Sequence, residues 1–152
     1  MIYLGIDPGK SGGIAYIVQR RVVCLPMPRT ERDTWEVINR LILKNCKGAM
    51  IEWIHPAIPG IGKSQMSKLY GNYMQLRGFL IATGISFEDV KPVAWQRGLG
   101  ISPRKKTETR TQWKNRLKAK AQELFPELTI TLATSDALLL AEYCRRKRTG
   151  TL

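Results

Sequence analysis

The sequence has few cysteines and almost no histidine, which excludes several kinds of site. Cys24, Cys46 and Cys144 are widely separated, and His55 is the single histidine among 152 residues. No CxxC pair or Cys/His cluster occurs, so a structural zinc site has no ligands to form it. An odd number of scattered thiols is typical of a reducing compartment rather than of a disulfide scaffold.

The sequence also lacks a membrane segment and is poor in acidic residues. No apolar run approaches a bilayer span and no signal peptide is recognisable, so we expect a soluble, cytoplasmic protein with no membrane partner. Only 12 Asp and Glu stand against 25 Lys and Arg, which gives a net charge of +13. A field of this sign attracts polyanions, and nucleic acid is the commonest of them. A ribosomal-type or heparin-like binder, or a charge that only confers solubility, is the alternative.

Apolar spacing predicts the order of the secondary-structure elements. Strands are expected at 2–7, 14–18, 22–25, 49–54 and 85–90, with a hairpin at Arg20-Arg21. Helices are expected at 34–44, from Ser64 to Gly84, at 107–124 and at 136–146, with a loop from the last strand to Pro103. Residues 128–132 fit a strand or an extended connector. This order predicts an α/β fold with a mixed five-stranded sheet flanked by helices.

The chain shows no repeat and no linker, so we expect a single domain over residues 1–152. Hydrophobic residues make up 43% of the sequence, which is enough for one core. Residues 145–152 are basic, and we expect them to form a flexible tail.

Three acidic residues lie where the surrounding sequence argues against a charge. Asp7 ends a strand before a glycine-rich turn, Glu52 lies inside an apolar strand, and Asp136 lies in the first turn of an apolar helix. A buried carboxylate costs several kcal/mol unless it is paired or binds a metal. If the three converge, they form a pocket suited to Mg²⁺ and to two-metal hydrolysis of a phosphodiester, in which one ion activates a water and the other stabilises the leaving oxygen. Taken singly, Asp7 is also explained as a turn former, Glu52 as a buried ion-pair partner and Asp136 as a helix-dipole acid.

The three acids occur within an ordered set of motifs. The set is Gly5-Ile6-Asp7-Pro8-Gly9, then Ile51-Glu52, then Met74 to Leu80 with Gly84-Ile85, then Pro92-Val93-Ala94-Trp95-Gln96, and finally Ser135-Asp136-Ala137-Leu138-Leu139. It resembles the RuvC family of Holliday-junction resolvases over nearly the whole chain. The segment at Pro92 resembles the family's phage and organellar-type members.

This resemblance implies a ribonuclease-H-like fold and a crossover junction endodeoxyribonuclease acting in DNA recombination and repair. It implies a homodimer that nicks two opposing strands of a four-way DNA junction, with Mg²⁺ as cofactor and Mn²⁺ as a substitute. It implies that Asp7, Glu52 and Asp136 bind the metal and carry catalysis, with no small-molecule cofactor. The helix from Ser64 is then the dimer surface, although a core role explains that helix equally well. The small size and the lack of a transit-like segment favour a phage or bacterial protein.

One position departs from the family's pattern. RuvC-like proteins usually have a fourth ligand, Asp or His, about a turn before the last acid, where this chain has Ala133. Three explanations stand side by side. Asp136 acts without a neighbour, a residue such as Ser135 or Glu142 substitutes, or Ala133 is an engineered inactivation.

Basic residues cluster in a loop and on one helix face. They are Arg104, Lys105, Lys106, Arg110, Lys114, Arg116, Lys118 and Lys120. We expect Arg104, Lys105, Lys106, Arg110 and Lys114 to contact DNA phosphates, together with Lys63, Lys68 and Arg77 from the preceding long helix. A solvated helix face is the simpler alternative.

Two rival functions remain open. Residues 57–64 satisfy a relaxed P-loop pattern with Ala57 in place of the first glycine, which is typical of a nucleotide hydrolase. Pro59 removes an N–H from that phosphate cradle. The other rival is a non-catalytic branched-DNA-binding module of the same fold, for which Ala133 is the argument. His55, three residues after Glu52, either positions a water or a phosphate or is structural, and we favour the structural role.

Overall fold

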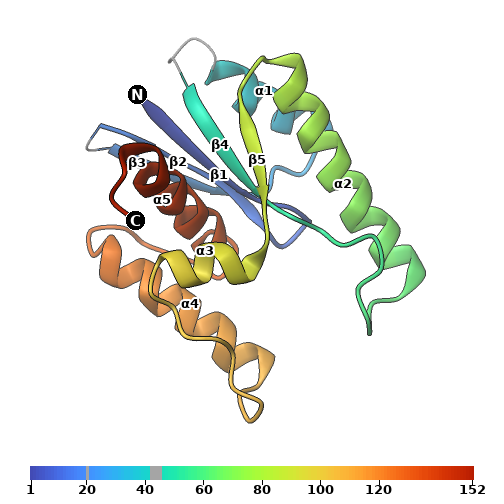
Figure 1. The fold of residues 1–152 in the computed structure, drawn as a ribbon. Coiled ribbons are helices and arrows are strands. Elements are labelled where there is room, and N and C mark those ends of the chain that lie inside the picture. The colour runs from blue at the N-terminus through green and yellow to red at the C-terminus, as the bar shows by residue number, and fades with distance from the viewer. Residues whose placement is uncertain (20, 42–45) are drawn as a thin grey trace.

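The first predicted strand lies at the centre of a five-stranded mixed sheet (Figure 1). The computed structural model describes residues 1–19, 21–41 and 46–152. Its strands are β1 (Ile2–Asp7), β2 (Gly13–Val18), β3 (Arg21–Pro26), β4 (Cys46–Glu52) and β5 (Phe87–Val90). Their order is β3-β2-β1-β4-β5, with β2 antiparallel to both β1 and β3, and with β4 parallel to both β1 and β5. The predicted α/β fold class is confirmed.

Helices cover both faces of the sheet (Figure 1). They are α1 (Glu31–Arg40), α2 (Lys63–Ala82), α3 (Pro92–Gly98), α4 (Arg110–Leu124) and α5 (Ser135–Thr149). Local signals set their starts, because the Thr30 side chain accepts from Asp33 N, and Thr109 forms a capping box with Gln112. No helix within the described ranges is long and apolar enough to cross a membrane.

The alternation of β1 divides the interior into two cores. Ile2, Leu4 and Ile6 point to the face that α1 and α2 cover, where they pack with Leu76 and Leu80 of α2. The opposite face carries the core formed by α3, α4 and α5. Asp7 therefore ends β1 on the α5 side of the sheet, as the alternation predicts.

Helix α5 lies directly against β1 because Gly5 has no side chain. A Cβ atom built on Gly5 would lie 2.2 Å from both Ala137 O and Ala141 N. A second glycine, Gly13 of β2, admits the turn before α5, since a Cβ there would lie 2.6 Å from Ala133 O. The N-terminus of α5 is thereby held close to the end of β1 where Asp7 lies.

Several predicted boundaries were wrong. Helix α1 spans Glu31–Arg40 instead of 34–44, and strand β4 spans Cys46–Glu52 instead of 49–54. Residues 42–44 of the predicted helix, and Arg20 of the predicted hairpin, lie outside the described residues. The loop expected before Pro103 contains helix α3. Residues 128–132 form a connector without strand structure, which is one of the two alternatives left open for them.

The predicted flexible tail was also wrong in large part. Helix α5 continues to Thr149, and Gly150 ends it with a left-handed φ of 71°. Lys147 and Arg148 both pair with Glu88 of β5, at 2.6 and 3.2 Å. These contacts attach the basic end of the helix to the sheet edge. The three cysteines are free, as predicted.

Candidate active site

Asp7 and Glu52 lie side by side at one edge of the sheet. They end the parallel strands β1 and β4, whose register pairs Ile6 with Ile51 immediately before them. Both side chains point to the α5 face, because their neighbours Ile6 and Ile51 belong to the opposite core. The turn after Asp7 is held in place by α2, since Gly9 N donates to Asn72 Oδ1 at 2.8 Å.

Asp136 joins them from the first turn of α5. Its backbone is positioned by the close packing of α5 on Gly5, and its side chain is buried, with an exposed fraction of 3% for the residue. Asp7 is almost as buried, at 8%. The structure thus brings the three predicted acids together into a carboxylate cluster, defined here as Asp7, Glu52 and Asp136.

The cluster carries more negative charge than its surroundings neutralise. Burial raises the pKa of Asp7 well above its usual value, and the charges of Glu52 and Asp136 raise it further. Burial, followed by the charge of Asp136, raises the pKa of Glu52 to about 7. Carboxyl groups perturbed in this way are typical of functional sites, because a purely structural arrangement would pair them.

Among the described residues, Lys114 of α4 provides the one ammonium that interacts electrostatically with all three acids. Its Nζ lies 2.5 Å from Asp136 Oδ2. Burial alone would lower the pKa of Lys114, but the carboxylates of Asp136, Asp7 and Glu52 outweigh that effect and raise it. The residue that we expected on a DNA-facing surface therefore reaches into the acidic site.

Two further donors orient the carboxylates. Trp95 of α3 is fully buried, and its Nε1 donates to Glu52 Oε2 at 3.0 Å. Ser135 Oγ donates to Asp136 Oδ1 at 3.0 Å. Sequence reasoning missed the role of Trp95, because its helix is too short for a periodic signal. Its indole N–H in an apolar segment was the available hint, since a buried indole needs an acceptor.

The donor set fits a hard divalent cation in its chemistry. Three carboxylates, buried at Asp7 and Asp136 and half-buried at Glu52, with raised pKa values at Asp7 and Glu52, favour binding of a further positive charge. Within the described residues, no three Asp, Glu, His or Cys side chains are already arranged around a common point for a metal ion. In this arrangement the oxygens of Asp136 accept hydrogen bonds from Lys114 and Ser135, and Glu52 Oε2 accepts one from Trp95.

The candidates for a fourth ligand are now distinguishable. Ala133 lies in the turn before α5 and has no donor to offer. Glu142 lies two turns along α5, where Arg145 and Arg146 hydrogen-bond both of its carboxylate oxygens at 2.7–2.8 Å. Those contacts commit Glu142 to an ion pair away from the cluster. Ser135 remains adjacent to Asp136 as a hydrogen-bond donor.

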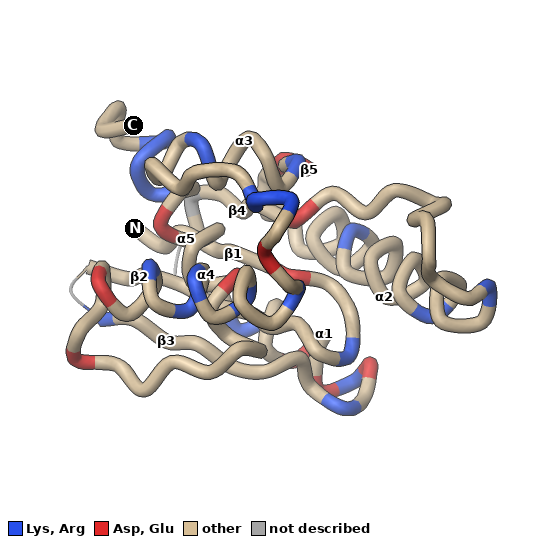
Figure 2. The backbone as a smooth tube through the Cα atoms, turned by 90° about the horizontal axis from the view of Figure 1, so that it is seen from below, with Lys and Arg blue, Asp and Glu red and all other residues tan. Residues whose placement is uncertain are grey.

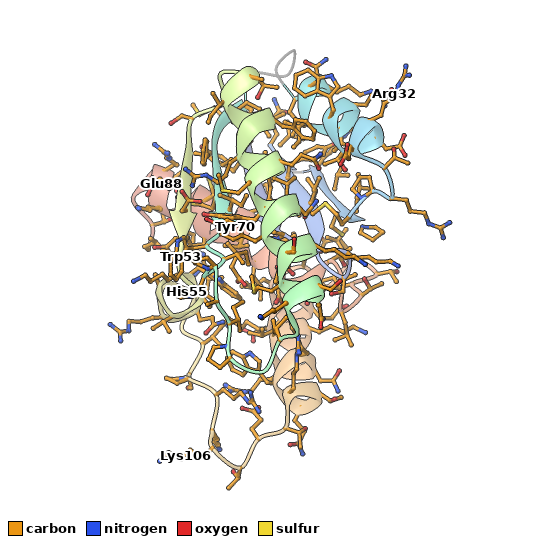
Figure 3. All side chains as sticks on the ribbon, turned by 90° about the vertical axis from the view of Figure 1, so that its right-hand side faces the viewer. Arg32, Trp53, His55, Tyr70, Glu88 and Lys106 are labelled. Carbon is orange, nitrogen blue, oxygen red and sulfur yellow. The ribbon has the colours of Figure 1, made fainter. Side chains whose placement is uncertain are left out.

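Most of the predicted DNA-binding residues are exposed beside this edge of the sheet. Lys63 and Lys68 are exposed near the start of α2, and Lys105, Lys106 and Arg110 are exposed before and at the start of α4. The 55–62 loop with the start of α2, and the 102–109 loop with the start of α4, project to the same side of the molecule (Figures 1 and 3). Lys106 lies at the tip of the second projection (Figure 3). Seen from that side, Lys and Arg occur along both projections (Figure 2).

The other predicted DNA contacts are engaged within the protein. Arg77 pairs with Asp89 and lies over the rings of Phe87 and Tyr73. Arg104 donates to Glu108 O at 2.9 and 3.1 Å. Arg116 stabilises the same loop, because its guanidinium donates hydrogen bonds to the Glu108 carboxylate and to the carbonyl oxygens of Ser102 and Pro103. The 102–109 loop is therefore a braced projection that presents Lys105 and Lys106.

The loop that resembles a P-loop forms an apolar pocket instead of a phosphate cradle. The pocket has a volume of about 410 Å³ and is lined mainly by Pro56, Ala57, Ile58, Ile61 and Met66. His55 stabilises the loop, since its Nδ1 accepts from Ala57 N at 3.0 Å and its ring packs on Trp53. This matches the structural role expected for His55.

Comparison with known proteins finds solved structures with the same fold but no related sequence family. No family model matches the chain, and no curated protein sequence matches it significantly. Among solved structures, the chain is similar to T. thermophilus RuvC in complex with a Holliday junction substrate, with TM-score 0.64 and 13% identity over 99% of this chain and 97% of that one. It is also similar to a Thermus thermophilus RuvC structure, with TM-score 0.60 and 14% identity over 99% and 98% of the two chains. The chain therefore has the RuvC-type, ribonuclease-H-like fold that its motifs predicted.

Proposed function

We propose that this chain is a metal-dependent endonuclease that cuts four-way DNA junctions. The observation that carries the proposal is the carboxylate cluster, which lies at the edge of a RuvC-type sheet between two basic projections. A solved structure of the same fold is a complex with a Holliday junction substrate. Buried acids inside a protein of net charge +13 are hard to explain without a ligand for them.

In this proposal some residues of the site bind the cation and others hold those ligands in position. Bound Mg²⁺ or Mn²⁺ would supply Lewis acidity and a water of lowered pKa for attack on the phosphodiester. Asp7, Glu52 and Asp136 would hold the cation. Trp95 keeps the Glu52 carboxylate in one orientation, and the packing of α5 on Gly5 sets the position of Asp136.

The basic projections account for DNA binding without base recognition. Lys63, Lys68, Lys105, Lys106 and Arg110 form no ion pair with any residue in the described ranges, so their charges are available to phosphates. Two projections on either side of the carboxylate cluster suit a branched substrate, because its arms diverge from the point of cleavage. Contacts of this kind position the backbone and carry little sequence information.

The exposed face of the long helix α2 supports a homodimer as part of the proposal. Exposed residues recur along α2 at heptad spacing, namely Ser64, Ser67, Gly71, Met74, Gly78 and Ile81. Met74 and Ile81 are 48% and 67% exposed, and a Cβ on Gly71 or Gly78 would meet nothing within 4 Å. Small and apolar residues at this spacing allow two helices to pack closely. Two copies would present two carboxylate clusters, as paired nicks require.

The test is cleavage of a synthetic four-way junction beside a linear duplex and an RNA–DNA hybrid, with and without Mg²⁺. We expect junction cleavage that depends on the metal and disappears in Asp7→Asn. Equal cleavage of all three substrates would favour a different nuclease of this fold. Tight junction binding without cleavage would favour the non-catalytic module, and Ala133→Asp would then test the missing ligand.

A further inference from the structure

The carboxylate cluster contains a cation that belongs to the chain itself. The Lys114 ammonium contacts Asp136 Oδ2 and interacts electrostatically with Asp7 and Glu52 as well. Its stem comes from α4, and the neighbouring Leu117 and Ala121 anchor that helix in the core beneath α5. The side chain is 32% exposed, so it reaches the acids from the solvent side of the site. The ammonium is therefore held there by a packed helix rather than by a free loop.

The charges at the site determine how many cations it can hold. Carboxylates that hold a cation must be ionised, so the metal-binding form of the cluster carries three negative charges. The Lys114 ammonium, 2.5 Å from Asp136 Oδ2, reduces that total to two, which one divalent cation balances. A second divalent cation would leave the site with an excess positive charge beside an ammonium. It would also need a further ligand, and the turn before α5 offers the methyl group of Ala133. Repulsion between like charges at a few ångströms in a buried site is strong.

We infer that Lys114 supplies the positive charge that a second metal ion provides in a two-metal nuclease, so that each cluster binds a single divalent cation. The inference rests on the proposed function, because it concerns the same metal site. Lys114 and the cation compete for the Asp136 carboxylate in the free protein. The absence of a ligand at Ala133 agrees with this inference, because one cation needs fewer ligands than two.

The competition predicts that removing the ammonium strengthens metal binding. Lys114→Met keeps most of the side-chain stem and removes the charge, so we expect Mn²⁺ to bind at least about tenfold more tightly than to the unaltered chain. The matched control is Lys118→Met, one turn further along α4. It removes the same charge from a residue that forms no ion pair within the described ranges, and we expect a change of less than about threefold.

The experiment is a calorimetric titration of the full chain with Mn²⁺ in the absence of DNA, checked by electron paramagnetic resonance. The unaltered chain is expected to bind one Mn²⁺ per protomer. This stoichiometry decides the question even if Lys114→Met fails to fold, which circular dichroism in EDTA would reveal.

Two results would overturn the inference. One is two Mn²⁺ per protomer in the unaltered chain, and the other is equal Mn²⁺ affinity in a folded Lys114→Met and in Lys118→Met. If the chain also cuts junctions, either result leaves the proposed function intact. Failure of both the unaltered chain and Lys114→Met to bind Mn²⁺ would instead overturn the metal-dependent function, and the inference with it.

Discussion

At the scale of single residues, the fold of the candidate site holds three carboxylates close together despite their mutual repulsion. Asp7, Glu52 and Asp136 are held together by strand register and helix packing, although their charges repel one another. Lys114, Trp95 and Ser135 relieve part of this repulsion. The remaining negative charge lowers the stability of the metal-free protein and favours binding of a cation.

The raised pKa of Glu52 predicts a specific dependence of stability on pH. Its pKa is about 7 in the folded protein against an ordinary value of 4.5, so between these values the unfolded chain has released a proton that the folded chain retains. The free energy of unfolding in EDTA should therefore fall as the pH rises from 4.5 to 7, by about 1 to 3 kcal/mol from this group. Urea unfolding of Glu52→Gln should lack this component. The exposed Glu127→Gln is the control, and identical pH slopes in both variants would contradict the account.

Trp95 is expected to act as a positioning residue for Glu52. Trp95→Phe keeps the ring in the core and removes the hydrogen bond to Glu52 Oε2. Loss of a hydrogen bond that orients a metal ligand typically costs about 10- to 100-fold in metal affinity, so Mn²⁺ affinity should fall roughly tenfold or more. Trp35→Phe, on α1 and packed against Phe79, should leave that affinity unchanged. Equal affinities in both variants would show that the indole only fills space.

At the scale of the elements, the site depends on how closely α5 lies on β1. Strand β1 contributes Asp7 and the glycine that admits the helix, and α5 contributes Asp136. Gly5→Ala would place a methyl group 2.2 Å from the backbone of α5, where no side chain can move aside. We expect a loss of about 3 kcal/mol or more in the free energy of unfolding, together with weaker metal binding.

The control for Gly5→Ala is another strand glycine. A Cβ on Gly48 of β4 lies 3.2 Å from the flexible end of the Arg148 side chain, so Gly48→Ala should cost less than about 1 kcal/mol. Chemical denaturation of both variants measures the difference. Similar losses would mean that the contact of α5 with Gly5 is not special.

The sequence predicted these elements unevenly, for physical reasons. The alternation of Ile2, Leu4 and Ile6 indicates both a strand and the face on which Asp7 lies, because one side of that strand is entirely aliphatic. Helix α3 was missed because a seven-residue helix completes fewer than two turns, which is too short for periodicity. The end of α5 was taken for a loose tail because its charges suggested solvation. The partner that orders it, Glu88, is distant in sequence.

The candidate site was predictable to a similar extent. The three acids stand out because each is isolated among apolar or turn residues. Lys114 does not stand out, because it lies in a run of basic residues, and only the packing of α4 against α5 turns it toward Asp136. Sequence patterns therefore identify charged residues in unexpected surroundings. Which of those residues contact one another depends on tertiary packing.

At the scale of the whole molecule, the two projections beside the acids both carry exposed positive charge, as the proposed DNA contact requires. Lys105 and Lys106 lie on the braced loop that projects furthest on that side (Figure 3). The double variant Lys105→Ala/Lys106→Ala should lower junction affinity and reduce the slope of log affinity against log salt by about 2. Arg32→Ala/Arg40→Ala removes the same charge from α1, where both residues pair with Glu36, and should change the slope little. Fluorescence anisotropy at several salt concentrations measures both, and equal slopes would exclude the loop from the interface.

The most direct test of the central claim is a map of the nicks on a four-way junction, with each of the four strands end-labelled in turn. The account predicts two nicks at symmetric positions on opposing strands in Mg²⁺, and none in EDTA or with Asp7→Asn. Cleavage of a linear duplex at the same rate, or nicks that persist in Asp7→Asn, would contradict it.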